Sequence, residues 1–283
     1  MNRILVSFLL SVSLSLPSMG GSVSFPYPQL PSRIKDQNRQ VLWFARHFWD
    51  EAGDVSLYDN SELEQAVVDY LTVLEELPDS KLKAPVRRFI RKVSDMDTIL
   101  PLVDKYLYDV DSPMRDDGLY AFLISRMSFV GSRELLLQIS ANAPGTPAVD
   151  FRMEDKSGNS LYLYDLLSAN HQTLIFFYDD SCAHCREVIS DVKSSAELAY
   201  LSALGALKLL CVNISGEAIP VSFPVYCTDT RLSDEDFFTE GKYFFRSMPS
   251  FFLIGPDGKI LLKETNLKEA LNHCAEKQNI KLH

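Results

Sequence analysis

The apolar positions in the first half of the chain follow a helical period. Between residues 39 and 142 they recur three or four positions apart, as at Leu63, Val67 and Tyr70. One face of an amphipathic helix has this spacing, whereas a half-buried strand alternates apolar and polar residues. Pro78 ends the clearest run, because proline does not continue a helix interior. The pattern predicts four to six helices and no strand, so we expect an all-α domain.

The pattern changes after a short segment that contains two prolines and a glycine. Residues 143–147 read Ala-Pro-Gly-Thr-Pro, a composition that interrupts regular structure and is typical of a connection between domains. We therefore predict a helical domain of unknown function over residues 21–142 and a second domain over residues 143–283.

Short β-rich runs separated by helical patterns follow this boundary. Residues 174–177, Leu-Ile-Phe-Phe, are apolar at consecutive positions, as expected for a strand covered on both faces. Strands are predicted at residues 148–153, 173–178, 206–214, 250–255 and 259–263, and helices at residues 161–167, 183–204, 234–241 and 267–278. Strand, helix and strand followed by a hairpin and a helix predict an α/β sandwich.

The N-terminus has the layout of a secretory signal peptide. Arg3 supplies a positive charge, residues 4–16 are apolar apart from serines, and Pro17 and Gly20 follow. These features predict a signal peptide over residues 1–20 with cleavage near Gly20. An uncleaved membrane anchor is the alternative, although the apolar run is short for a bilayer span. We expect an exported protein of the periplasm or cell envelope, soluble after cleavage.

Composition and charge narrow the functional classes. With 283 residues, of which 46% are hydrophobic, the chain has the composition of a globular protein. The formal net charge is −10, and removal of Arg3 with the signal peptide makes it −11. Since no long basic run occurs, we expect no nucleic-acid partner.

All five cysteines lie in the last part of the chain, from Cys182 onwards. A disulfide-stapled scaffold would distribute its cysteines more widely, so chemistry is the better explanation for at least one pair. Cys182-Ala183-His184-Cys185 directly follows a predicted buried strand and stands where the next helix begins. The four residues therefore form the main candidate site.

A cysteine at a helix N-terminus is chemically distinctive. The unpaired amides and the helix dipole stabilise a negative charge there, so we expect Cys182 to have a lowered pKa and to act as a nucleophile. Cys185 lies one turn further on the same side and is predicted to resolve the mixed disulfide. The partial positive charge of His184 would stabilise the Cys182 thiolate and make the pair more oxidising.

The order of strand, Cys-x-x-Cys, helix and a later Pro249 before a strand resembles the thioredoxin-fold thiol–disulfide oxidoreductases. Residues 143–151 and the turn Pro256-Asp257-Gly258-Lys259 further resemble the TlpA/ResA-like branch of that family. The resemblance implies an α/β thioredoxin-like sandwich over roughly residues 143–280. It also implies a cis peptide bond at Pro249, with Met248 facing the cysteine pair and the neighbouring backbone binding the substrate.

The resemblance extends to partners and to the first half of the chain. It implies that protein thiols and disulfides are the substrates, that a separate redox partner resets the cysteine pair, and that no cofactor is needed. Ala183-His184 stands where many relatives have Gly-Pro, and Ser181 replaces a common aromatic residue. Residues 105–120 resemble an uncharacterised helical module that precedes such domains in some envelope proteins.

Other interpretations of the cysteines stay open. Cys211 and Cys227 form either a second, structural disulfide or two buried free thiols. Cys274 is expected to be a core residue or a spare thiol without a catalytic role. One competing hypothesis is a non-catalytic binding module with a static disulfide. Another is a copper or zinc carrier that uses Cys182 and Cys185 with His171 or His273, although no metal site is predicted. The favoured prediction is thiol–disulfide exchange, as a reductant or isomerase.

Overall fold

The computed structural model describes residues 24–93, 95–127, 132–215, 219 and 221–280. The chain divides into two compact units, residues 1–136 and residues 137–283, which we call the helical unit and the sheet unit. The predicted signal peptide, residues 1–20, lies outside the described residues. Helix α7 (Ser132–Ser140) crosses the division between the units, and the predicted domain boundary before residue 143 follows its end.

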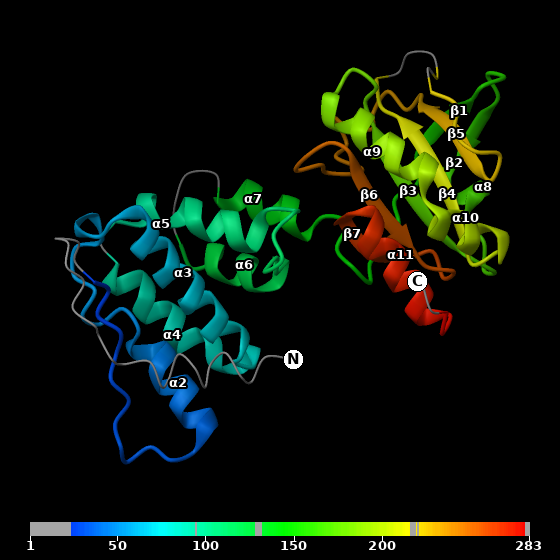
Figure 1. The fold of residues 1–283 in the computed structure, drawn as a ribbon. Coiled ribbons are helices and arrows are strands. Elements are labelled where there is room, and N and C mark those ends of the chain that lie inside the picture. Colours follow the sequence, from blue (N-terminus) through cyan, green and yellow to red (C-terminus); the bar gives the residue numbers. More distant parts are fainter. Residues whose placement is uncertain (1–23, 94, 128–131, 216–218, 220, 281–283) are drawn as a thin grey trace. The chain divides into compact units, whose positions relative to one another are not determined.

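Every regular element described in the helical unit is a helix, as predicted (Figure 1). Aspartates at the N-caps of four of the helices accept hydrogen bonds from first-turn amides, which satisfies donors that have no partner within the helix. The helices before α7 are α2 (Gln37–His47), α3 (Asn60–Glu75), α4 (Asp79–Lys92), α5 (Met96–Val103) and α6 (Asp117–Ile124), with a 3₁₀ turn η1 (Val55–Leu57) and a π turn η2 (Asp104–Tyr108).

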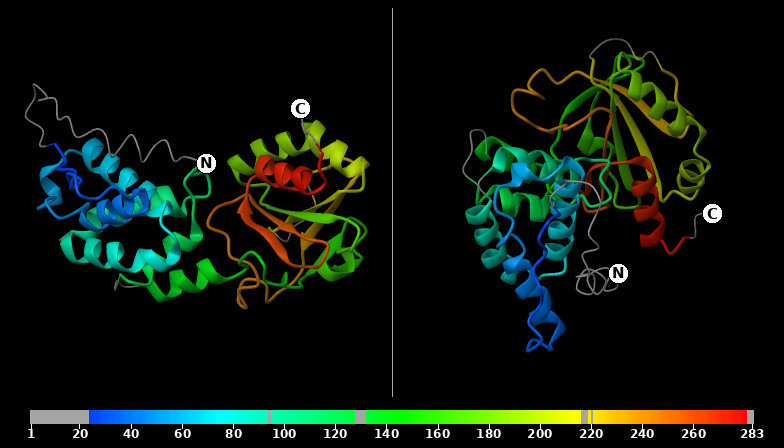
Figure 2. Two further views of the ribbon diagram at one scale, coloured as in Figure 1. Left: turned by 90° about the horizontal axis from the view of Figure 1, so that it is seen from below. Right: turned by 60° about the vertical axis from the view of Figure 1, so that its left-hand side comes forward.

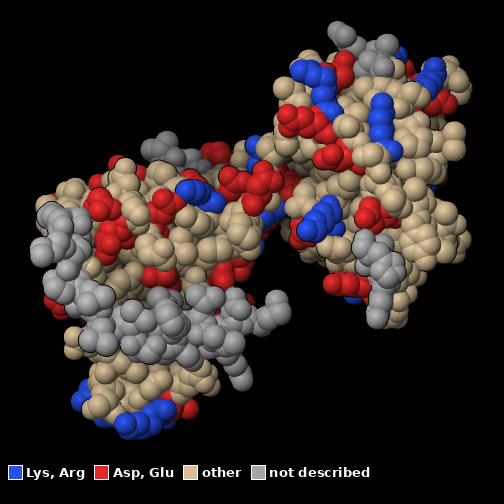
Figure 3. Space-filling view, in the orientation of Figure 1, with Lys and Arg blue, Asp and Glu red and all other residues tan. Residues whose placement is uncertain are grey.

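Aromatic rings from three helical segments form the core of the helical unit. The ring of Tyr70 lies 5.2 Å from that of Phe48 and 5.0 Å from that of Phe89, measured between centroids. Phe48 is fully buried. Aromatic pairs at such distances add to the stabilisation that burial provides. On the visible outer face of this unit, acidic side chains are scattered among uncharged ones (Figure 3).

The sheet unit contains a mixed sheet of seven strands in the order β2-β1-β5-β4-β3-β6-β7. Strands β3, β4 and β5 are parallel, whereas β6 is antiparallel to β3 and β7 is antiparallel to β6. The strands are β1 (Arg152–Asp155), β2 (Ser160–Tyr162), β3 (Gln172–Tyr178), β4 (Leu207–Asn213), β5 (Cys227–Leu232), β6 (Ser250–Ile254) and β7 (Ile260–Thr265).

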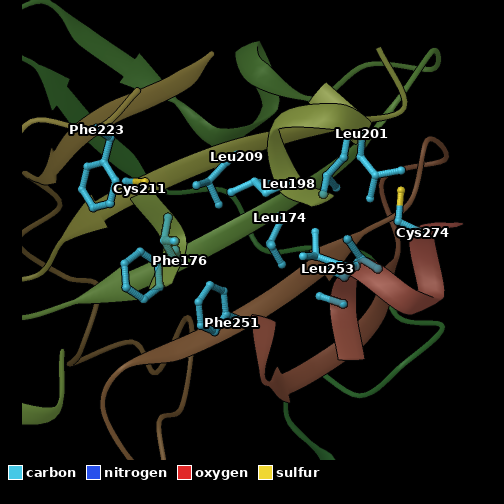
Figure 4. Close-up of a cluster of buried hydrophobic side chains, with 14 of the residues drawn as sticks. Leu174, Phe176, Leu198, Leu201, Leu209, Cys211, Phe223, Phe251, Leu253 and Cys274 are labelled. Carbon is cyan, nitrogen blue, oxygen red and sulfur yellow. The ribbon is translucent and has the colours of Figure 1, made fainter. Parts of the chain in front are cut away.

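Helices α9 (Ala183–Ser194), α10 (Ala196–Ala203) and α11 (Leu267–Lys277) cover one face of this sheet (Figure 1 and Figure 2). The cluster beneath them includes Phe176 of β3, whose ring stacks on Phe251 of β6 at 4.5 Å (Figure 4). A second cluster lies on the other face, around Phe177 and Phe252. All seven positions of β3 are buried, which confirms the prediction of a strand covered on both faces.

Two predicted helices differ from the structure. The predicted helix over residues 183–204 is two helices, because the backbone of Ser195 is extended and its hydroxyl accepts from the Leu198 amide to cap α10. The predicted helix over residues 234–241 is a series of turns. There the Asp234 carboxylate accepts from the Arg152 amide at 3.0 Å and from the Lys242 amino group at 2.9 Å, which holds the segment in a nonhelical shape.

The first strand and the following helix are also displaced. Residues 148–153 were expected to be a strand, but β1 begins at Arg152 because Ala148 instead donates its amide to the Gly258 carbonyl. The segment expected as a helix over residues 161–167 begins in β2 and contains only the short α8 (Leu163–Leu166). Within the described ranges, every helix is too short or too polar to span a bilayer.

Lys263 connects β7 to the last turn of α7. Its side chain is buried, and its amino group donates to the carbonyls of Gln138 and Ile139, each at 2.9 Å, and of Ala141 at 2.7 Å. The last carbonyls of a helix have no partner within the helix. The amino group therefore supplies donors to carbonyls at this partly buried helix end.

Replacing Lys263 by Met should destabilise the protein, because buried carbonyls lose their donor while the side chain keeps most of its length. A buried polar group without a partner costs about 1–3 kcal/mol, so the free energy of unfolding measured in urea should fall by about that amount. Lys259→Met is the matched control, since the Lys259 side chain is 53% exposed. Equal losses in the two variants would contradict the account.

Candidate active site

The candidate cysteines follow directly from the end of β3. After Tyr178 the chain makes a turn in which the Asp179 carboxylate accepts from the Ser181 amide at 2.8 Å and from its hydroxyl at 2.7 Å. Aspartate commonly stabilises a turn in this way, by accepting from the backbone two residues on. The turn places Cys182 at the N-cap of α9.

Cys182 and Cys185 differ sharply in their surroundings. The Cys182 sulfur is partly exposed and accepts from the Cys185 amide at 3.5 Å. The Cys185 side chain is fully buried, and its sulfur accepts from the Asp179 amide at 3.5 Å. The structure therefore leaves one sulfur partly exposed and buries the other, while the roles of nucleophile and resolving cysteine stay predictions.

These surroundings shift the two pKa values in opposite directions. The Cys185 amide, then the Cys185 thiol and the His184 amide, lower the pKa of Cys182, although burial and the negative charge of Asp179 oppose them. Burial is the main cause that raises the pKa of Cys185 to about 12. The exposed sulfur is thus the one that forms a thiolate more readily, and thiolate is the form that attacks disulfides.

The other two residues of the motif lie in the first turn of α9. Ala183 begins the helix, and the His184 side chain is 61% exposed. The imidazole Nδ1 lies 3.4 Å from a carboxylate oxygen of Glu187, one turn along the helix. His184 contributes to the lowered pKa of Cys182 through its backbone amide. A tuning effect of the imidazole on the cysteine pair stays a prediction.

Met248 and Pro249 lie close to the end of β3 that leads to the cysteine motif. The peptide bond between them is cis. The next residue, Ser250, begins β6 and pairs with Phe177 near the end of β3. Met248 also packs against the hydrophobic cluster that contains Cys185 and against which Cys182 packs. The sheet thereby brings together two segments that are more than sixty positions apart in the sequence.

The predicted second pair lies on neighbouring parallel strands. Cys211 is buried in β4, and the partly exposed Cys227 begins β5, where it pairs in register with Leu209. Burial, together with the Cys227 thiol, raises the pKa of Cys211. All five cysteines are free thiols in this structure, so a bond between Cys211 and Cys227 stays a prediction. Cys274 is buried in the core, as expected.

The hypothesis of a metal carrier receives no support from the arrangement of side chains. Among the described residues, no three or more His, Cys, Asp or Glu side chains are grouped so that they could hold a metal ion. His171 immediately precedes β3, whereas Cys182 follows that seven-residue strand, so the two lie at opposite ends of it. His273 is in α11.

The structure adds residues that the sequence analysis missed. The guanidinium of Arg186 donates to the carbonyls of Asp180 at 3.1 Å and of Ser181 at 3.0 Å, which fixes the turn before Cys182. The buried Asn213, at the end of β4, donates to the Asp180 carboxylate at 3.3 Å. A polar residue at the end of an apolar strand was the available signal for Asn213.

Comparison with known proteins identifies the fold. The chain is similar to a thioredoxin-like protein from Bacteroides caccae, with 22% sequence identity and a TM-score of 0.71, over 90% of this chain and 99% of the other. The sheet unit has a thioredoxin-like fold. This confirms the predicted fold class, a thioredoxin-like sandwich preceded by a helical region. Residues 9–135 match a family model described as a domain of unknown function, DUF5106.

Two further solved structures are similar over about half of the chain. One is the thioredoxin domain of a thiol-disulfide oxidoreductase from Bacteroides vulgatus, with 19% identity and a TM-score of 0.37 over 49% of this chain and 99% of the other. The other is a putative thiol:disulfide interchange protein DsbE from Chlorobium tepidum, with 22% identity and a TM-score of 0.37 over 49% and 96%. No curated protein matches the sequence.

Replacing His184 by Pro tests whether first-turn amides stabilise the Cys182 thiolate. Proline is tolerated in the first turn of a helix but has no amide hydrogen, so the pKa of Cys182 should rise. The measurement is the rate of iodoacetamide modification of Cys182 against pH, whose midpoint in the wild type should lie below that of an ordinary cysteine.

His184→Ala is the matched control, because it removes the same imidazole but keeps the amide hydrogen. The midpoint should therefore be higher in His184→Pro than in His184→Ala. Identical midpoints would show that the His184 amide contributes nothing and would contradict the assignment.

Proposed function

We propose that the protein catalyses thiol–disulfide exchange on other proteins through Cys182 and Cys185. One observation carries the proposal: two cysteines one helical turn apart have pKa values shifted in opposite directions, with the lower value at the exposed sulfur. An attacking thiolate must reach its substrate, whereas a resolving thiol is best kept protonated until the mixed disulfide has formed. A purely structural cysteine pair would not require this difference in exposure and pKa between its two sulfurs.

The exchange proceeds in two displacement steps. The Cys182 thiolate attacks one sulfur of a substrate disulfide, which forms a bond between Cys182 and the substrate and releases the other substrate sulfur as a thiolate that takes up a proton. Cys185 then loses its proton and attacks the Cys182 sulfur, which forms the Cys182–Cys185 disulfide and releases the second substrate sulfur. The pair has lost two electrons, and the substrate has gained them.

The surroundings of each sulfur assist a different part of this cycle. The amide of Asp179 donates to the Cys185 sulfur, so it stabilises the negative charge that Cys185 acquires when it loses its proton. The first-turn amides stabilise the Cys182 thiolate, which makes Cys182 a better leaving group when the pair is reduced again. The same chemistry run backwards oxidises a substrate.

We further propose that the protein acts as a reductant or isomerase in the cell envelope. The resemblance of residues 143–151 and of the turn at Pro256-Asp257-Gly258 to the TlpA/ResA-like branch supports this direction, and the signal-like sequence of residues 1–20 supports export. Because each net reduction of a substrate leaves the pair oxidised, a redox partner must return two electrons to it before the next reduction. Ser247 to Pro249 would contact the substrate beside Cys182.

Replacing Cys185 by Ser should trap the intermediate of the first step. Incubated with a disulfide-bonded protein such as insulin, the reduced variant should form a covalent adduct through Cys182 that dithiothreitol releases, because no resolving thiol is present. Gel electrophoresis without reductant and mass spectrometry of the linked peptides identify the adduct. Wild type should instead complete the reaction and accumulate little adduct.

Two further variants make the result specific. Cys182→Ser should form no adduct and have no exchange activity, whereas Cys274→Ser removes a buried thiol of the same unit and should behave as wild type. An adduct on Cys227, or none at all with Cys185→Ser, would refute the assignment of Cys182 as the nucleophile.

A further inference from the structure

The segment that leads into Pro249 is held by an ion pair from β7. One carboxylate oxygen of Glu264 accepts from the backbone amide of Arg246 at 2.5 Å. The other oxygen lies 2.8 Å from the guanidinium Nε of the same arginine. The side chains are 9% exposed for Arg246 and 2% exposed for Glu264. A single carboxylate therefore holds both the main chain and the side chain of Arg246.

Such an arrangement constrains the backbone more than an ordinary ion pair does. Burying two charges costs free energy, which is offset only when the geometry is good and the remaining hydrogen-bonding groups are satisfied. A surface ion pair tolerates movement of two long side chains, but a bond to the Arg246 amide fixes the position of the peptide group itself. The carboxylate thus ties β7 to the chain two residues before Met248.

An irregular backbone conformation in β7 positions the Glu264 carboxylate. Glu264 has a φ of 46°, in the left-handed region that residues other than glycine adopt at a cost of about 1–3 kcal/mol. Its neighbour Thr265 pairs with Phe251, and the register shifts between that pair and the next one. The irregular conformation turns the Glu264 side chain inward, toward the segment before Pro249.

The segment that leads into Pro249 carries peptide groups for which the described part of the chain supplies no hydrogen-bond partner. Ser247 is exposed and Met248 is half-buried. Among the described residues, none forms a hydrogen bond with the main chain of Ser247 or Met248. Regular pairing begins at Ser250, beside the end of β3 that leads to Cys182. An extended polypeptide can pair with such free peptide groups, as in strand addition to a sheet edge.

We propose that Glu264 and Arg246 are positioning residues that select extended, disulfide-bonded polypeptides over small disulfides. This inference rests on the proposed function. The ion pair holds the Ser247–Met248 peptide groups at a fixed distance from Cys182, so that a polypeptide paired with them presents its disulfide to the Cys182 thiolate. A small disulfide has no backbone to pair, so its reaction depends less on this segment.

The test compares two substrates in wild type and Glu264→Gln. The substrates are insulin, a disulfide-bonded protein whose reduction is followed by turbidity with dithiothreitol as the electron donor, and the small aromatic disulfide 5,5′-dithiobis(2-nitrobenzoate), whose reduction by the pre-reduced protein is followed by absorbance. Glutamine keeps the size of the side chain but removes its charge, so the ratio of kcat/KM for the protein to kcat/KM for the small disulfide should fall about tenfold, mainly through KM for the protein.

Glu154→Gln is the matched control. Glu154 forms an ion pair with Arg231 across β1 and β5, which β4 and β3 separate from β6, so its loss should leave the substrate ratio unchanged. If Glu264→Gln does not fold, Glu264→Asp gives the same test, because it keeps the charge but is one carbon too short to hold both the amide and the guanidinium of Arg246. Its ratio should fall as well.

The outcomes separate the two proposals. An active wild type with an unchanged ratio in Glu264→Gln would overturn the positioning role alone, as would equal losses with both substrates. A wild type that reduces neither substrate would overturn the proposed function and this inference with it.

Discussion

The Cys182 sulfur accepts a hydrogen bond from the Cys185 amide at the start of α9, and the proposed chemistry depends on this contact. The amides of the first helical turn stabilise a thiolate at Cys182, while burial keeps the Cys185 thiol protonated. The helix begins at Ala183, which makes Cys182 its N-cap and places Cys185 in its first turn. The turn made by Asp179 and Ser181 determines that starting point, because it directs the chain from the end of β3 into the helix.

The thioredoxin-like sheet brings the second part of the site to the first. Strand β3 is covered on both faces and is therefore rigidly held, and β6 runs antiparallel beside it. The end of β3 and the beginning of β6 consequently lie side by side. Cys182 follows the first, and Pro249 precedes the second. Glu264 and Lys263, adjacent in β7, secure two other segments, one before Pro249 and one at the end of α7.

Much of this arrangement could be predicted from local sequence patterns. Helical spacing indicated the helical unit, a continuous apolar run indicated β3, and the spacing of Cys182 and Cys185 indicated the candidate site. Strand β5 was missed because it contains polar residues at Thr228, Asp229 and Arg231 and has little apolar surface. The pair of Arg246 and Glu264 was missed for another reason, since eighteen positions separate two charged residues whose burial only the folded sheet determines.

The reduction potential of the Cys182–Cys185 pair tests the central claim most directly. It can be measured by equilibrating the purified protein in dithiothreitol and glutathione buffers and counting the thiols at each ratio. A pair that exchanges electrons with proteins should give a single reversible transition between about −270 and −120 mV, the range that thiol–disulfide exchange proteins span from thioredoxin to strong oxidants. A potential below about −300 mV, as structural disulfides have, or the absence of any transition, would contradict the account.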